Sequence, residues 1–142
     1  MIKKRFLVEQ AYAELALAGY QFDLDPAEIQ FGLQRLEFML SEWSEAWELD
    51  VGYLPAADLS EIDPDDDSGL TAGKVRAIAL NLAVEIAQNK GKQVSPLTLN
   101  KAAQALSELQ IHTPATAVNP DTLPVGAGNK PGWIYNTFFT GQ

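Results

Sequence analysis

The sequence contains no cysteine and only one histidine, His112. Disulfides and thiolate chemistry are therefore excluded, and a zinc site or a Cys–His or Ser–His pair lacks its components. No apolar run approaches the roughly 20 residues that a membrane-spanning helix needs. The polar–apolar alternation typical of β-strands is nearly absent. We therefore expect an all-α protein with no cofactor, no metal and no membrane contact.

Basic residues are few, and the charge is unevenly spread along the chain. The formal net charge is −9. Residues 23–67 carry fourteen acids against one base, Arg35, whereas residues 68–142 carry six bases and three acids. This acidity argues against nucleic-acid binding by charge, which needs clustered Lys and Arg. It favours head-to-tail pairing of the acidic part of one copy with the basic part of the next; the alternative is that water solvates both parts.

Four segments show the three-to-four spacing of apolar residues that is typical of helices. The first runs from about residue 2 to 18, and the third from about residue 71 to 90. The second begins with Asp25 as N-cap and Pro26 at the first helical position, and the fourth begins with Ser95 and Pro96 in the same roles. We expect these segments to form a four-helix bundle over residues 1–110, with a long acidic loop at residues 48–70.

The spacing also predicts which residues form the core. The second helix has one continuous apolar stripe, formed by Ile29, Leu33, Leu36, Leu40, Trp43 and Trp47. Phe31, Phe38 and Met39 lie beside this stripe, and we expect them to widen the buried face. In the fourth helix the expected core positions are Leu99, Ala102, Ala103, Leu106 and Leu109.

The acidic loop partly matches a calcium-binding loop. Asp63, Asp65 and Asp67 occupy its first, third and fifth positions, but Ser68 and Lys74 stand where the motif needs glycine and a bidentate glutamate. We therefore expect a solvated acidic loop, or one that faces a basic partner, rather than a metal site.

A second group of acids crowds the end of the second helix, where negative charge opposes the helix dipole. Bases of a neighbouring subunit, a channel or water would compensate this charge. Two of these carboxylates could act as the acid and base of a glycoside hydrolase, but neighbours on one helix face do not face each other across a cleft. We predict no catalytic residue. The predicted channel-facing or inter-subunit acids are Glu42, Glu45, Glu48, Asp65, Asp66 and Asp67.

Residues 111–142 have no apolar period and are rich in proline and glycine. They nevertheless end in an aromatic stretch, Trp133–Phe139. A segment that cannot build a core but carries large apolar side chains buries them on another chain. We predict an extended, largely non-helical docking arm whose partner-binding residues are Pro124, Val125, Gly126, Gly128, Trp133, Tyr135, Phe138 and Phe139.

The order of these pieces resembles a known family. The pieces are the stretch Leu36–Trp43, the acidic loop, Gly69-Leu70-Thr71 leading into Val75–Ala83, and the stretch Leu123–Asn129. Together they resemble the tail accessory factors of short-tailed bacteriophages, also known as packaged-DNA stabilisation or head-completion proteins. The resemblance extends from about Val8 to Lys130, and the aromatic end has no counterpart in it.

The resemblance implies a structural virion protein at the head-to-tail junction, assembled in the host cytoplasm. It implies a ring of twelve copies bound below the dodecameric portal protein, with the C-terminal arms docked on portal subunits. Such a ring extends the DNA channel, helps to retain the packaged genome and provides a platform for the tail nozzle or hub. DNA passes through it without sequence-specific binding, since an acidic wall does not grip phosphates.

Two other functions are compatible with the residues alone. One is a virion-associated glycoside hydrolase acting on peptidoglycan, with Glu42 or Glu45 as the acid. The other is a small regulatory binding module whose tail folds on a single partner.

Overall fold

The computed structural model describes residues 1–17 and 24–112. As predicted, this part of the chain is all-α: it contains four helices and no β-strand. The helices are α1 (Lys4–Leu17), α2 (Pro26–Trp47), α3 (Ala72–Asn89) and α4 (Pro96–His112).

Two helix starts have the capping residues that the sequence indicates. The Asp25 side chain accepts a hydrogen bond of 2.9 Å from the Glu28 backbone N–H, with Pro26 at the first position of α2. Ser95 Oγ accepts one of 3.2 Å from the Thr98 backbone N–H at the start of α4. Each cap satisfies a backbone donor that the first helical turn leaves without a partner.

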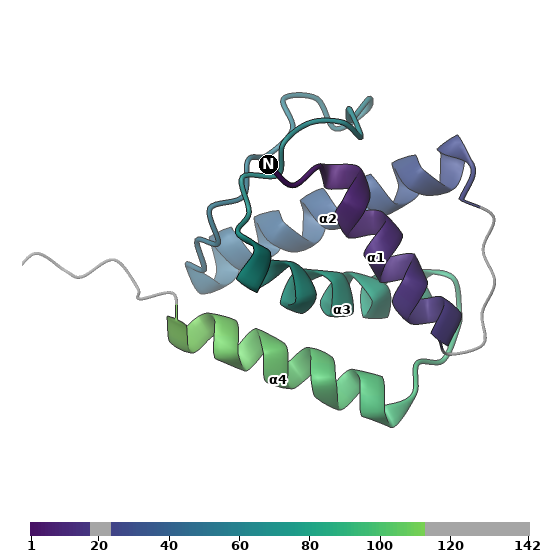
Figure 1. Ribbon diagram of the computed structural model, residues 1–142, viewed down its shortest axis with the longest axis vertical. Coiled ribbons are helices and arrows are strands. Elements are labelled where there is room, and N and C mark those ends of the chain that lie inside the picture. Colours follow the sequence, from purple (N-terminus) through teal and green to yellow (C-terminus); the bar gives the residue numbers. More distant parts are fainter. Residues whose placement is uncertain (18–23, 113–142) are drawn as a thin grey trace, which may run out of the picture.

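Helix α3 is the centre of the fold. It contacts α1, α2 and α4, whereas α4 contacts no helix other than α3 (Figure 1). Its buried face alternates alanines with larger residues such as Ile78, Leu82 and Ile86, which lets several helices approach it closely. The apolar spacing of the third helix predicts a core face whose members are all buried except the half-buried Val75; they are Val75, Ile78, Ala79, Leu82, Ala83 and Ile86.

A close contact also joins α1 to α2. A β-carbon added at Gly32 would lie 2.5 Å from Val8 Cγ1. That distance is far below van der Waals contact, so the glycine lets the α1 side chains rest directly on the α2 backbone.

Some core predictions are wrong. Phe38 is 50% exposed and Trp47 is 48% exposed. Phe38 follows Leu36 by two residues, which places it about 200° around the helix from the buried stripe. The Arg35 guanidinium lies over its ring, 5.8 Å from the centroid. Trp47 is in the last turn of α2, where its ring stacks on buried Trp43 and leaves its outer face free.

The predicted core of α4 is also partly wrong. Leu99 and Ala103 are exposed, whereas Ala102 and Leu109 are buried and Leu106 is half-buried. Because α4 packs on one helix only, its buried face is narrow. The apolar stripe in the α4 sequence is therefore wider than the face that α3 covers.

The loop of residues 48–70 is fixed to the beginning of the chain. The Lys4 and Arg5 backbone N–H groups donate to the carbonyl oxygens of Asp66 at 3.0 Å and Pro64 at 2.9 Å. The Ser68 backbone N–H donates to the Ile2 carbonyl at 2.8 Å. Loop carbonyls thus satisfy donors in the first turn of α1 that no capping side chain serves. The loop also contributes side chains to the core, namely Leu49, Val51, Ile62 and Leu70.

Candidate interaction surfaces

A buried ion pair fixes the middle of α2. The Glu37 carboxylate accepts a hydrogen bond of 2.9 Å from Lys4 Nζ, and the two side chains are only 2% and 1% exposed. The same oxygen accepts from the Tyr53 hydroxyl at 2.7 Å and from the Ala56 backbone N–H at 3.1 Å. Burial and the hydrogen bond to Glu37 raise the pKa of Tyr53 well above its ordinary value. Glu37 therefore holds α1, α2 and the loop together.

A second carboxylate also connects helices, near the beginning of α2. Lys90 Nζ donates to both oxygens of Glu28, at 2.6 and 2.5 Å, and the Tyr12 hydroxyl donates to one of them at 2.8 Å. The hydrogen bond from Lys90 lowers the pKa of Glu28, whereas burial raises the pKa of Tyr12. Glu28 thus connects α2 to α1 and to the end of α3.

The sequence did not identify Glu28 and Glu37 as residues that connect helices. In both cases the partner lysine is distant in the sequence, by 62 residues for Glu28 and 33 for Glu37. The available signal was weak: each glutamate directly precedes or follows a residue of the apolar stripe, where a solvated side chain is not expected.

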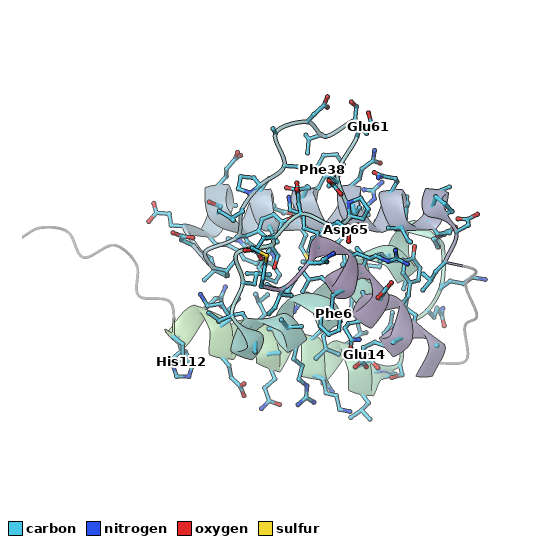
Figure 2. All side chains as sticks on the ribbon, turned by 45° about the horizontal axis from the view of Figure 1, so that its top comes forward. Phe6, Glu14, Phe38, Glu61, Asp65 and His112 are labelled. Atoms are coloured by element: carbon cyan, nitrogen blue, oxygen red, sulfur yellow. The ribbon has the colours of Figure 1, made fainter. Side chains whose placement is uncertain are left out.

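The predicted acids of the loop make contacts with residues of their own chain. Asp65 pairs with Lys3 at 2.7 Å, which lowers the pKa of Asp65. The Asp67 side chain accepts from the Gly69 backbone N–H at 3.2 Å, and the Asp66 carbonyl accepts from Lys4. Figure 2 shows Asp65 beside the start of α1 and Glu61 at the far tip of the loop. Among residues 1–17 and 24–112, no group of three or more His, Cys, Asp or Glu side chains is arranged to hold a metal ion.

The predicted acids of α2 lie together at its carboxyl end. We call Glu42, Glu45 and Glu48 the α2 acidic end. All three are exposed, and none makes an ion pair with any residue that the structure describes. The last turn of α2 holds no basic residue, and its last residue, Trp47, is 48% exposed.

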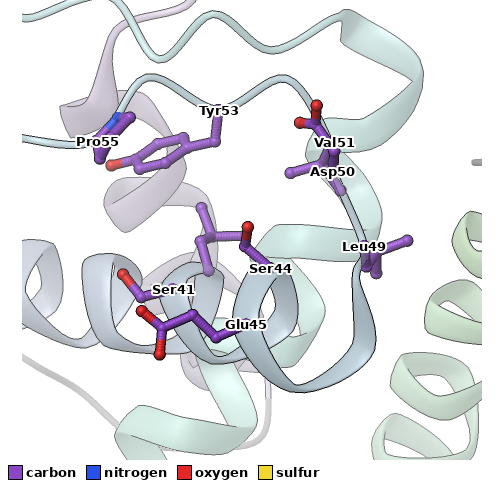
Figure 3. A pocket seen from close by; sticks show the side chains of 9 residues that line it. Ser41, Ser44, Glu45, Leu49, Asp50, Val51, Tyr53 and Pro55 are labelled. Atoms are coloured by element: carbon purple, nitrogen blue, oxygen red, sulfur yellow. The ribbon is translucent and has the colours of Figure 1, made fainter. Parts of the chain in front are cut away.

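A shallow pocket of about 170 Å³ lies between this part of α2 and the loop (Figure 3). Glu45 and Asp50 both line it, together with Ser41, Ser44 and Tyr53. In Figure 3 the Asp50 carboxylate turns away from Glu45, and it accepts a hydrogen bond of 2.7 Å from the Gly52 backbone N–H. The pocket is smaller than the roughly 300 Å³ at which ligand sites begin. It does not present two carboxylates facing each other across a sugar-sized cleft.

A groove of about 190 Å³ runs between α3 and α4. We call it the α3–α4 groove; its lining residues are Gly73, Arg76, Ala77, Leu80, Lys101, Gln104, Ala105 and Glu108. Arg76 and Lys101 are exposed, and neither makes an ion pair within the described part of the chain. Glu108 accepts a hydrogen bond of 3.0 Å from Gln104. The groove is therefore lined by apolar side chains and by two cations that make no ion pair with the residues described.

The predicted arm residues lie outside the part of the chain that the structure describes, and their docking role stays a prediction. These residues are Pro124, Val125, Gly126, Gly128, Trp133, Tyr135, Phe138 and Phe139.

None of the helices in the described ranges is both long enough and apolar enough to cross a membrane.

The fold and these surfaces define a small all-α domain held together by buried acid–base contacts, with unmatched charge of both signs on its surface. The profile of the P22 tail accessory factor family matches residues 3–140, which is nearly the whole chain. The chain belongs to this family, and the resemblance found in the sequence is confirmed. A comparison with curated proteins found no match. Family membership makes the protein a structural accessory component of a bacteriophage tail that associates with other parts of the virion.

Proposed function

We propose that this protein is a connector subunit, which binds below the portal as a ring and extends the channel through which DNA leaves the head. The observation that carries the proposal is the family match over residues 3–140. In such a ring each copy contributes several weak contacts, and the high effective concentration of its neighbours makes the assembly stable.

The distribution of charge supports a role around DNA that does not depend on gripping it. The exposed loop acids such as Glu61 carry negative charge, and DNA phosphates are repelled by such a surface. A protein that bound DNA by charge would instead place clustered Lys and Arg there. An acidic wall does not bind the phosphates and therefore lets the genome slide.

We assign attachment to the portal to the segment that follows α4. Its composition favours burial on another chain over independent folding, since it combines prolines and glycines with Trp133, Tyr135, Phe138 and Phe139. A disordered segment that orders on its partner can cover a large surface at moderate affinity. The remaining copies in the ring then raise the total binding strength.

Truncation after α4 tests this proposal. Because α4 ends at His112, deletion of residues 113–142 leaves all four helices and their contacts intact. We expect the truncated protein to keep its helical circular dichroism and thermal midpoint but to lose binding to purified portal rings in cosedimentation. Binding that survives the truncation would overturn the assignment.

A matched pair of variants separates the arm from the bundle. Replacing Trp133, Tyr135, Phe138 and Phe139 by alanine should weaken binding about as much as the truncation does. Phe38→Ala removes a half-exposed aromatic ring from the bundle surface and should leave portal binding unchanged. Equal losses from both variants would show that the bundle, not the arm, makes the attachment.

A further inference from the structure

Two cations of the α3–α4 groove make no ion pair within the described part of the chain, although other bases of this region have partners there. Lys74 Nζ donates to the Val51 carbonyl at 2.8 Å, and Lys90 is bound to Glu28. Arg76 and Lys101 make no ion pair with residues 1–17 or 24–112 and line the groove from opposite helices, α3 and α4. Between them lie the apolar side chains of Ala77, Leu80 and Ala105.

The α2 acidic end has the complementary chemistry. Its three carboxylates are exposed at the end of α2, whose last residue, Trp47, is 48% exposed. Its charge is unfavourable in the isolated subunit, because it adds to the negative end of the α2 dipole without a basic residue in the last turn. The loop acid Asp65 differs, since Lys3 already neutralises it. Of the two acidic regions, the α2 acidic end is thus the one that gains more from an external cation.

The two surfaces belong to helices on different sides of the molecule. Helix α3 lies between α2 and α4, and α2 and α4 do not contact each other (Figure 1). No ion pair joins Glu42, Glu45 or Glu48 to Arg76 or Lys101 within one copy. Different patches on one subunit that match each other produce heterologous contacts, which generate rings when the rotation closes.

We propose that the α2 acidic end of one copy docks in the α3–α4 groove of the next, with Glu45 and Glu48 placed against Arg76 and Lys101. This inference rests on the proposed connector function, because it names the contact between neighbouring copies of the ring. The contact is electrostatic and partly exposed, so raised ionic strength weakens it. The ring geometry supplies the strength that a single contact lacks.

Site-specific photocrosslinking identifies what occupies the groove. The chain contains no cysteine, so Gln104→Cys, at an exposed residue that lines the groove, can be labelled at one position with a benzophenone maleimide while Arg76 and Lys101 are kept. Labelled protein is bound to portal rings and irradiated, and the attached peptide is identified by mass spectrometry. We expect a product with twice the mass of the chain, in which the label is attached to a peptide containing residues 42–50. Attachment to a portal peptide or to DNA, or no product in the bound complex, would overturn the inference.

Glu61→Cys is the matched control, because Glu61 is an exposed acid at the tip of the loop and lies outside both surfaces. Its label should give little of the doubled product. A protein that fails to bind portal rings at all would contradict the connector function, whereas a bound protein without the doubled product contradicts only the contact proposed here.

Charge exchange provides an independent measurement. Arg76→Glu combined with Lys101→Glu should reduce the number of copies bound per portal ring several-fold at low salt. Adding Glu45→Lys and Glu48→Lys to the same chain should restore it, because the reversed surfaces match again. Failure of the exchanged chain to recover, with helical content unchanged, would count against the pairing.

Discussion

The two ends of α2 use the same type of residue in opposite ways. At the amino end, Asp25 caps the helix and Glu28 is bound by Lys90 and Tyr12. At the carboxyl end, the three glutamates of the α2 acidic end are exposed and have no ion-pair partner among the residues described. The dipole favours acids at the first end and disfavours them at the second. The first set therefore stabilises the fold, and the second carries an electrostatic cost that a cation from a neighbouring copy would reduce.

The largest loss of stability is expected when Glu37, in the middle of the same helix, is replaced. Glu37→Ala should lower the free energy of unfolding by about 3–5 kcal/mol, because Lys4 would stay buried without a counter-charge. Such a loss is a large part of the 5–15 kcal/mol typical of a domain, and urea denaturation measures it.

A double variant keeps this prediction testable if the single variant does not fold. Lys4→Met with Glu37→Leu removes both buried charges and replaces them with apolar side chains of similar size. It should recover only part of the lost stability, because the Tyr53 hydroxyl and the Ala56 N–H still lose their acceptor. A single variant that costs less than about 1 kcal/mol would show that water reaches the pair.

At the amino end of α2, we expect replacement of Glu28 to cause a moderate, pH-dependent loss of stability. Glu28→Gln should lower the free energy of unfolding by about 1 kcal/mol near neutral pH, since the pair is partly exposed. The pKa of Glu28 is held below 4.5 in the folded protein, so its contribution is complete above that pH and is lost as the pH falls through the folded value. The denaturation curves of the two proteins should therefore converge in acid.

Glu45→Gln is the matched change at the other end of the helix. It should alter the stability of the isolated subunit by less than about 0.5 kcal/mol at any pH, as expected for an exposed side chain away from special contacts. Equal effects at Glu28 and Glu45 would remove the distinction between the two ends.

A small gain in stability is expected at Glu48, which ends α2 in the left-handed region with a φ of 52°. This conformation costs a residue with a β-carbon about 1 kcal/mol, and glycine adopts it freely. Glu48→Gly should therefore raise the free energy of unfolding by about 0.5 kcal/mol, the remainder being offset by the greater freedom of glycine in the unfolded chain. Glu48→Gln removes the charge and keeps the strain, so thermal denaturation of both variants separates the two contributions.

Local rules in the sequence predicted the helices well. Asp25-Pro26 and Ser95-Pro96 are start signals that depend only on neighbouring backbone groups, so no tertiary contact could change them. The α3 core was predictable because α3 is covered by three helices, and its whole apolar face is needed. The burial predictions were wrong for Phe38, Trp47 and Leu99, because periodicity indicates which face is apolar but not how much of it another element covers.

The acid–base contacts were not predictable from local rules. Lys4 looks like part of a basic start, and Glu37 looks like one polar residue in an amphipathic helix; only the fold brings them within 2.9 Å. The loop likewise looked like a solvated connection, although Leu49, Val51, Ile62 and Leu70 among its acids were a sign that it is packed. The α2 acids are exposed, as expected for charged residues off the apolar stripe, and their channel-facing or inter-subunit role stays a prediction.

The attachment of α4 to a single neighbour has a mechanical consequence. A pull on the chain beyond His112 acts first on α4, and α4 is joined to the other helices only through α3. Elements with one interface open at lower free energy than those enclosed on several sides. Tension from whatever holds the chain end would therefore peel α4 from α3 before it disturbs the contacts among α1, α2 and α3.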